Sequence, residues 1–179
     1  MSKANKSNKA IKYRLYPNDE QKVMFAKTFG CCRFVYNQLL ALQKQRYKDG
    51  ESHLSKLKSN EFATRTLKKD YDFLKEIDKF AVSNAVFHLA DAYDRFFKKQ
   101  NHFPKFKSKR KSKKSYTINF TNNNILIGKN VIKLPKVGMV KAVIHKLPKD
   151  DWKLKSVTVS QDSVGNYFAS VLFEYEQED

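Results

Sequence analysis

The sequence predicts an α+β protein: a small β-barrel with a helical domain inserted after its first strand. Three observations support this prediction. Ile11, Tyr13 and Leu15 alternate with more polar side chains, as expected of a strand. A block of helical patterns follows up to Phe97, and short strand patterns separated by turn residues fill the chain from Tyr116 onward. Because one strand cannot stand alone, we expect the first strand to pair with the later ones.

The segment after the first strand carries the signals of two helices. Pro17 ends the strand, and Asn18 followed by Gln21 forms a capping box typical of a helix start. This helix is expected to run until Gly30 breaks it, and a second helix would follow over 31–48. Two helices joined in this way fit a helix-turn-helix pattern, which many helical hairpins share. The side chains expected to face inward are Val23, Ala26, Phe29, Val35, Leu39 and Leu40.

Two more helices are predicted before the composition changes. Residues 52–58 are polar and typical of a loop, and Ser59 is expected to cap a short helix. Asp78 is expected to cap the helix with the clearest apolar stripe in the chain. The residues of that stripe recur every three or four positions and are Val82, Val86, Leu89, Tyr93 and Phe96.

Six short strand patterns occupy the remainder of the chain. Asn-rich and Gly-containing turns separate them, and Gly165-Asn166 predicts that the last two strands form a hairpin. The expected strands are 116–120, 125–127, 131–134, 139–144, 155–160 and 167–174.

The charge of the chain points to a polyanionic partner. There are 36 Lys and Arg against 18 Asp and Glu, a formal net charge of +18. Between Arg95 and Lys149 there are 16 Lys and Arg and no acidic residue, which accounts for almost the whole surplus. An acid-free basic stretch suits phosphate binding, because each contact releases a counterion. The phosphate-binding candidates are Lys105, Lys107, Lys109, Arg110, Lys111, Lys113 and Lys114.

Two alternatives to nucleic acid exist for this basic stretch. A disordered basic tail is disfavoured because strand patterns lie on both sides of the stretch and within it. Binding to a membrane surface would require large apolar side chains along one face of a basic helix, and residues 105–114 have no such face.

Two further groups of residues are candidates for nucleic-acid contact. The first group could stack on exposed bases, with burial in the barrel core as the alternative, which we favour for Phe120. Its members are Phe103, Phe106, Tyr116 and Phe120. The second group opens the helix at Asp78, where Lys79 and Ser83 lie one turn apart and Phe80 could contact a thymine methyl group. A charged, solvated first turn is the alternative there.

No catalytic constellation is visible in the sequence. The four histidines are scattered, and the spacing of a metal site or of a phosphate-binding glycine loop is missing, so we expect neither a metal nor another cofactor. Cys31 and Cys32 are adjacent and are expected to be reduced core residues rather than nucleophiles. Because the two cysteines have no other thiol to pair with, we expect a reducing, cytoplasmic location. Neither a membrane-spanning stretch nor a secretory signal is found.

Seven short motifs, taken in order, resemble the TnpB (OrfB) family of insertion-sequence proteins. Each motif alone is weak, but together they cover the chain from Lys9 to about Glu174. They are Lys9–Pro17, Gly30–Asn37, Ile77–Ala81, Phe103–Lys107, Phe120–Asn124, Ile132–Lys136 and Ser156–Val159. Arg33, Tyr36 and Asn37 fall within the second motif, and we expect their role to be structural.

The resemblance implies a domain organisation and a function. An oligonucleotide-binding-like barrel, the wedge domain, would comprise 1–17, including a basic N-terminal tail, and 101–179, with a helical recognition domain at 18–100 between them. Together they would hold a guide RNA from the transposon end and read a short motif beside a double-stranded DNA target, as in other RNA-guided systems. The residues implied in motif recognition are Ser59, Lys79, Phe80, Ser83, Thr121 and Asn122. Serine at position 83, where the family can have a longer amide side chain, leaves the identity of the motif open.

The resemblance also implies what would complete the protein. Members of the family continue into a RuvC-like nuclease domain and a zinc ribbon, which would begin at about Gln177. We therefore expect this chain not to be an enzyme by itself and to require a nuclease domain in cis or in trans. The implied setting is the bacterial cytoplasm, in association with the nucleoid. A DNA-binding repressor without nuclease activity and a general RNA-binding protein are the alternative functions.

Overall fold

The computed structural model describes residues 5–177, and it combines helices with one antiparallel sheet. The chain forms two compact units. The first unit contains the sheet, from residues up to Phe25 and from Lys113 onward, and the second unit contains residues 26–112 and is helical. The mixed class and the order strand, helices, strands agree with the prediction. Of the expected basic tail, residues 1–4 lie outside the described part, whereas Asn5 and Lys6 already belong to the first strand.

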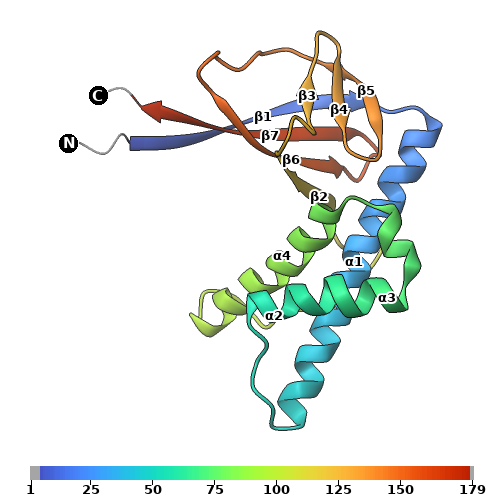
Figure 1. The fold of residues 1–179 in the computed structure, drawn as a ribbon, viewed down its shortest axis with the longest axis vertical. Helices are drawn as coiled ribbons and strands as arrows, with labels where there is room; N and C mark the ends of the chain where they lie inside the picture. Colours follow the sequence, from blue (N-terminus) through green and yellow to red (C-terminus); the bar gives the residue numbers. More distant parts are fainter. Residues whose placement is uncertain (1–4, 178–179) are drawn as a thin grey trace. The chain divides into compact units, whose positions relative to one another are not determined.

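Within residues 5–177, seven strands form the sheet of the first unit, and every neighbouring pair is antiparallel. Their order across the sheet is β2-β6-β7-β1-β5-β4-β3, and the sheet curls so that β3, β4 and β5 cross the end of β1 (Figure 1). The strands are β1 (Asn5–Tyr16), β2 (Lys114–Asn119), β3 (Leu126–Ile127), β4 (Val131–Leu134), β5 (Gly138–Val143), β6 (Lys153–Gln161) and β7 (Tyr167–Gln177).

Strand β1 lies in the middle of the sheet, which confirms that the first strand pairs with later ones. It pairs with β7 along its length and with β5 at its C-terminal end. Ile11, Tyr13 and Leu15 are buried, as their alternation predicts. The Tyr13 hydroxyl donates a hydrogen bond of 2.6 Å to the Lys146 carbonyl, so the polar tip of this buried ring is satisfied.

The six strands expected after Tyr116 are all present, with ends that differ by a few residues. The hairpin between β6 and β7 is confirmed, because the two strands pair antiparallel. In the turn between them, Gly165 adopts a φ of 101°, which glycine tolerates. The Asp162 carboxylate accepts hydrogen bonds from the backbone N–H groups of Asn166 (2.7 Å) and Val164 (3.1 Å). These bonds stabilise the charged carboxylate and lower the pKa of Asp162, the bond from Asn166 most of all.

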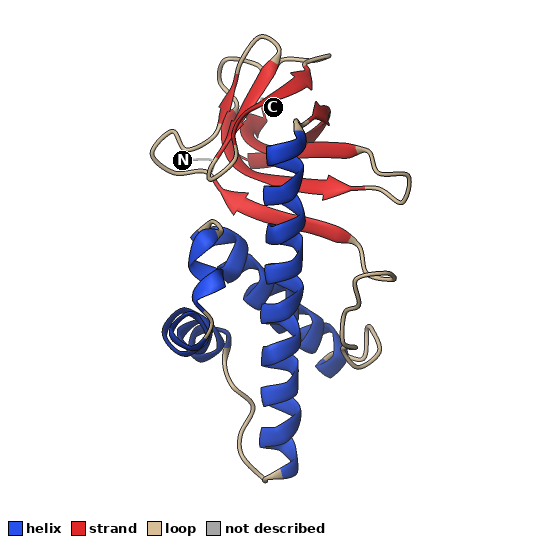
Figure 2. Ribbon diagram, turned by 90° about the vertical axis from the view of Figure 1, so that its right-hand side faces the viewer, coloured by secondary structure: helices blue, strands red, loops and turns tan. Residues whose placement is uncertain are grey.

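Helix α1 (Asp19–Lys48) is continuous, so the predicted break at Gly30 is wrong (Figure 2). A mid-helix glycine lowers helix stability by only about 1 kcal/mol relative to alanine, and burial of the residues on both sides of Gly30 outweighs that cost. The capping box is confirmed: the Gln21 N–H donates to Asn18 Oδ1 (2.8 Å), and the Asn18 N–H donates to Gln21 Oε1 (3.0 Å). Of the side chains expected inside, Val23 and Ala26 are exposed; the buried ones are Phe29, Val35, Leu39 and Leu40.

The second unit continues with one helical segment and a long final helix. The Ser55 hydroxyl, not that of Ser59, caps the segment by accepting the Lys58 N–H at 3.2 Å. The cap at Asp78 is confirmed, since its carboxylate accepts the Phe80 N–H at 2.8 Å. The elements are α2 (Lys56–Glu61), the π-helical turn η1 (Phe62–Leu67), α3 (Lys68–Asp70), the 3₁₀ helix η2 (Asp72–Glu76) and α4 (Lys79–Phe97).

The apolar stripe of α4 forms much of the helical core. Val82, Val86, Leu89 and Tyr93 are buried as predicted, and Phe96 is half-buried. Helix α4 packs against the α2 and η1 segments, and the Cys32 thiol of α1 donates to the Ala81 carbonyl of α4 at 3.4 Å. The unit therefore has an apolar core of its own.

Candidate nucleic-acid interface

The basic segment between α4 and β2 is anchored through the backbone of Lys107, and most of the residues beyond that point are exposed. Asn37 of α1 donates from Nδ2 to the Lys107 carbonyl (2.9 Å) and accepts the Lys107 N–H at Oδ1 (2.8 Å). Pro104 is buried beside this anchor. The Lys107 ammonium lies 4.2 Å from the centre of the Tyr36 ring, and burial lowers the pKa of Lys107. Lys107 is thus half-buried and holds the segment in place more than it presents a charge to solvent.

The cations on either side of Lys107 are placed differently. A tight turn follows, in which the Ser112 hydroxyl accepts the Ser108 N–H (2.9 Å) and the Ser108 hydroxyl accepts the Lys111 N–H (3.2 Å). The exposed cations of this region are Lys105, Lys109, Arg110, Lys111 and Lys113. Lys114 is half-exposed on β2. None of the cations of this segment forms an ion pair with an acid of residues 5–177, so their charge is available to phosphate.

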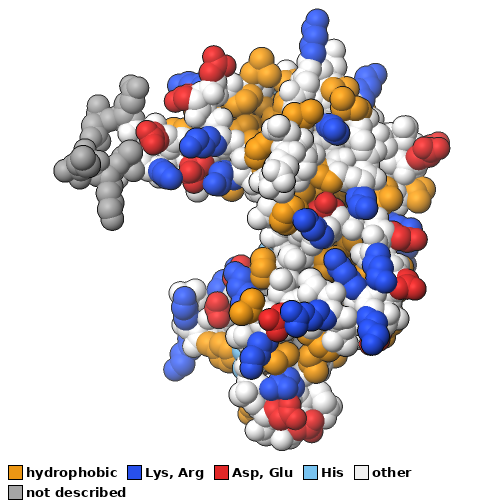
Figure 3. Space-filling view, in the orientation of Figure 1, with side chains coloured by type: hydrophobic (Ala, Val, Ile, Leu, Met, Phe, Trp, Pro, Cys, Tyr) orange, Lys and Arg blue, Asp and Glu red, His pale blue; other side chains and the backbone are white. Residues whose placement is uncertain are grey.

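Basic side chains are also common outside this segment. On the face drawn in Figure 3, Lys and Arg side chains are spread over the whole visible surface rather than gathered in one patch. This face therefore favours a polyanion, in keeping with the net charge of +18.

The residues implied in motif recognition lie in both units. Lys79 is exposed in the first turn of α4, with its ammonium 5.3 Å from the centre of the Phe80 ring. Phe80 and Ser83 are half-buried. Because the Asp78 carboxylate already accepts the Phe80 N–H, this helix end is partly neutralised and offers less to an anion than a free N-terminus would. Ser59 is buried in α2 beside a cavity of about 100 Å³.

Thr121 and Asn122 belong to an exposed turn of the first unit. The Thr121 N–H donates to Asn124 Oδ1 (2.9 Å), and the Asn124 side chain donates to the Asn119 carbonyl (2.9 Å). Asn122 and Asn123 both have positive φ values, 48° and 54°, which asparagine tolerates better than most residues. The turn is therefore fixed by the Asn124 side chain, and Thr121 and Asn122 are exposed.

Two of the four aromatic stacking candidates are exposed, and Phe120, which is expected in the core, is half-buried. Phe103 is 40% exposed and Phe106 is 51% exposed. The Lys44 ammonium lies 5.6 Å from the first ring and 4.5 Å from the second, so both rings stand beside a cation. Tyr116 is buried against Phe25, so its proposed stacking role is wrong.

A basic and aromatic surface on the sheet was not predicted. Lys12 lies 4.4 Å from the centre of the Phe168 ring, and the Arg14 guanidinium lies 4.9 Å from the Tyr16 ring. Arg14 also donates 2.7 Å to Asn166 Oδ1. The alternation along β1 gives the outward direction of Lys12 and Arg14, but the pairing of Arg14 with Phe168 depends on a strand register that only the structure provides.

Groups that could support catalysis are inert or dispersed. Burial raises the pKa of the Cys32 thiol to about 12, and burial also raises the pKa of Cys31, so both thiols stay protonated at neutral pH. Within residues 5–177, no three His, Cys, Asp or Glu side chains are grouped so that they could hold a metal ion. Over the same range, none of the helices has the length and apolar character needed to cross a bilayer.

Sequence similarity connects this chain to insertion-sequence proteins. Residues 5–52 match the family model HTH_OrfB_IS605, described as "Helix-turn-helix domain", although here they fold as β1 and the single helix α1. A Streptomyces pristinaespiralis protein described as "Putative RNA-guided DNA endonuclease" is 31% identical over 168 residues, covering 93% of this chain and 41% of the relative. InsQ of Escherichia coli (strain K12), described in the same words, is 28% identical over 178 residues, covering 93% and 40%.

A third relative is shorter. It is the virulence protein VsdF of Salmonella dublin, 32% identical over 111 residues, covering 56% of this chain and 93% of VsdF. The chain thus spans about 40% of the length of the two longer relatives and nearly all of the shorter one.

Proposed function

Because this chain belongs to the TnpB/OrfB family of insertion-sequence proteins, we propose that it binds a guide RNA and reads a short DNA motif next to the target. In this proposal it is the nucleic-acid-binding part of an RNA-guided DNA endonuclease. The observation that carries the proposal is the exposed basic segment around Lys109–Lys111, which has no acidic partner within residues 5–177. Such a segment binds phosphate without regard to sequence.

The two units would divide the work. The curled sheet would act as an oligonucleotide-binding-like wedge domain (1–17 and 101–179), and the helices would act as the recognition domain (18–100). The antiparallel order of the sheet and the central place of β1 support the first assignment. The independent core of the helices supports the second.

Motif reading would rest on polar and aromatic side chains rather than on charge alone. Lys79, Thr121 and Asn122 are exposed, and Phe80 and Ser83 are half-buried, so all five could reach a DNA duplex. Ser59 is buried, and its contribution would be to the packing of α2 or would require movement of that segment. Cleavage would come from a nuclease domain in cis or in trans, because a two-metal centre needs grouped acids.

Removal of four cations tests the role of the basic segment. The Lys109→Gln, Arg110→Gln, Lys111→Gln, Lys113→Gln variant should lose affinity for every RNA tested. The slope of log K against log salt should become shallower by about 3, since each single-strand phosphate contact contributes about 0.7. Binding would be measured by fluorescence anisotropy at several salt concentrations, with RNA from the 3′ end of the locus and with unrelated RNA.

The matched control removes the same charge from scattered sites. Lys22, Lys58, Lys69 and Lys129 are exposed, and their joint replacement by Gln should leave most of the affinity intact. Equal losses in the two variants would mean that net charge alone drives binding, and the basic segment would have no special role.

A further inference from the structure

A cavity of about 720 Å³ lies in the helical unit between the C-terminal ends of α1 and α4. It is separate from the basic segment beyond Lys107 and from the residues implied in motif recognition. Aromatic rings form most of its wall, and it is within the size range of ligand sites in proteins. The rings are His53, Tyr47, Tyr93, Phe96, Phe97 and Phe103.

Five of these rings pack against one another and leave the cavity open. His53 meets Tyr93 edge-on at 4.6 Å and Phe97 at 5.3 Å, and Phe103 meets Phe96 edge-on at 5.1 Å. Yet Phe97 is 57% exposed and Phe103 is 40% exposed. Such rings bury most of their area in an ordinary core, so faces that remain in water are available to a flat partner.

Tyr47 is the most exposed aromatic side chain of this wall. It lines the same cavity from the last turn of α1 and is 86% exposed. Its ring has no aromatic partner within residues 5–177. A tyrosine held outward in this way provides a stacking surface at the mouth of the cavity.

The cavity wall has a net positive charge. Lys44 and Lys48 belong to its wall, and neither forms an ion pair with an acid of residues 5–177. Glu51 also lines the cavity, but its carboxylate is bound to Arg46 at 2.7 Å. Because neither ammonium group has an acidic partner there, the two lysines favour an anionic ligand.

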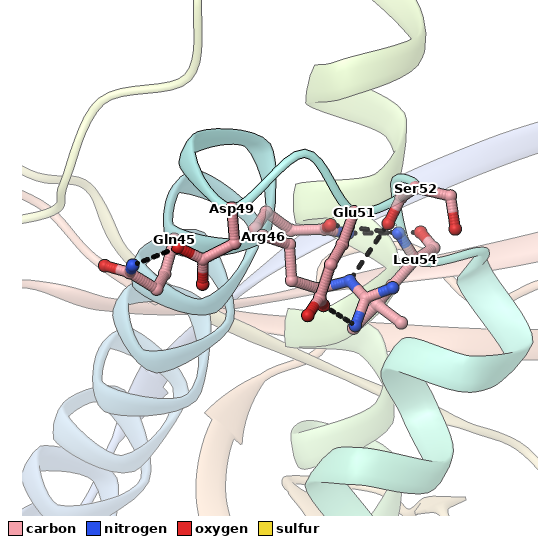
Figure 4. Close-up of polar contacts among 7 residues, drawn as sticks. Gln45, Arg46, Asp49, Glu51, Ser52 and Leu54 are labelled. Atoms are coloured by element: carbon pink, nitrogen blue, oxygen red, sulfur yellow. Dashed lines mark hydrogen bonds and ion pairs between the residues drawn. The ribbon is translucent and has the colours of Figure 1, made fainter.

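The loop that follows α1 forms part of the cavity wall, and a network of polar contacts holds it in place (Figure 4). Arg46 Nε donates to the Ser52 carbonyl (2.9 Å), and the Glu51 N–H donates to the Arg46 carbonyl (2.9 Å). Gln43 accepts the Leu54 N–H (3.0 Å) and donates to the Leu54 carbonyl (3.1 Å). Because these contacts fix the loop before any ligand arrives, less ordering entropy is lost on binding.

We propose that this cavity binds an unpaired base of the RNA, with its flanking phosphates on Lys44 and Lys48. The inference rests on the RNA binding proposed above and adds a site to it. Open ring faces suit the π-face of any base, and the lysines suit the phosphates on either side. Burial lowers the pKa of His53, so its ring is neutral at pH 7 and can exchange hydrogen bonds with a base edge.

An apolar segment of protein suits the cavity less well. It would cover the rings, but it would also remove water from Lys44 and Lys48 without supplying an opposite charge. A polynucleotide satisfies both features of the wall at once.

The test uses the full chain and the Tyr47→Ser and Phe97→Leu variants. Three probes of 12 nucleotides are compared: single-stranded RNA, an RNA backbone of the same length that is abasic at every position, and single-stranded DNA. Each variant should bind the intact RNA about tenfold more weakly, with the same salt slope as the wild type. All proteins should bind the abasic RNA with equal affinity. With 5-iodouridine in the RNA, crosslinks should form at Tyr47 or Phe97.

The matched controls are Tyr71→Ser and Phe73→Leu, which change partly exposed rings of the same unit outside the cavity. They should bind like the wild type. Unchanged affinity of the Tyr47 and Phe97 variants would overturn the base site while leaving RNA binding intact, as would tighter binding of the DNA. A wild-type dimer that Tyr47→Ser converts to a monomer would show that a second copy covers the cavity. If the wild-type chain binds no RNA, both proposals fail.

Discussion

Asn37 joins two segments of the helical unit that lie 70 residues apart in the sequence. Its amide group donates to and accepts from the backbone of Lys107, as a neighbouring strand would. The structural role expected for this residue agrees with that arrangement. The exposed cations that follow owe their position to this contact, so one side chain links the packing of α1 to the binding surface.

Replacement of Asn37 by alanine should therefore affect both stability and binding. Two partly buried backbone groups would lose their partners, which should lower the free energy of unfolding by about 1–3 kcal/mol. RNA affinity should fall as well, because the basic segment would be less ordered. Urea denaturation and fluorescence anisotropy would measure the two effects.

Asn37→Asp is the matched control for this change. Its carboxylate can still accept the Lys107 N–H but cannot donate to the Lys107 carbonyl, so an intermediate effect is expected. An alanine variant as stable as the wild type would show that the two hydrogen bonds between Asn37 and Lys107 do not hold the segment in place.

Helix α1 shows how an element can differ from its local signals. Gly30 and the family description both favour a turn, yet the helix continues through that position. A Cβ atom built at Gly30 would meet only the Arg33 guanidinium, at 3.7 Å, and Gly30 is not among the glycines with positive φ. The glycine is thus not required by the backbone, and packing of the flanking residues determines the helix.

Gly30→Ala tests the continuity of α1. In a continuous helix, alanine should raise the free energy of unfolding by about 0.5–1 kcal/mol, since glycine loses more backbone entropy on folding. Thermal and urea denaturation would measure the change. The Gly165→Ala variant is a control with the opposite expectation, because φ is 101° there. A less stable Gly30→Ala protein would indicate a turn at this position and contradict the continuous helix.

The strands could be predicted from the sequence better than the helix boundaries. Alternation and asparagine or glycine turns are local signals, so the strands after Tyr116 were found to within a few residues. Their order and register depend on contacts between distant residues, such as Arg14 with Phe168, which no local pattern contains. The N-cap of α2 is Ser55 rather than the predicted Ser59, because several serines nearby could serve as caps and local pattern does not choose between them.

At the scale of the molecule, charge and aromatic side chains carry the functional argument. The net charge of +18 was sufficient to predict a polyanionic partner, and the basic segment could be found by inspection of the sequence. The aromatic cavity could not, because its rings come from α1, the loop after it, α4 and the segment that follows. Tyr47 and Phe103 are brought together only by the packing of these elements.

As the guide-RNA-binding part proposed above, this chain should prefer its own guide RNA over other polyanions. The most direct measurement is the affinity of the purified chain for structured RNA from the 3′ end of its locus. Unrelated RNA and duplex DNA of equal length would compete for binding at several salt concentrations. We predict a preference for the locus RNA that persists near physiological salt. Equal affinity for all three, lost steeply as salt rises, would contradict the claim and leave a general polyanion binder.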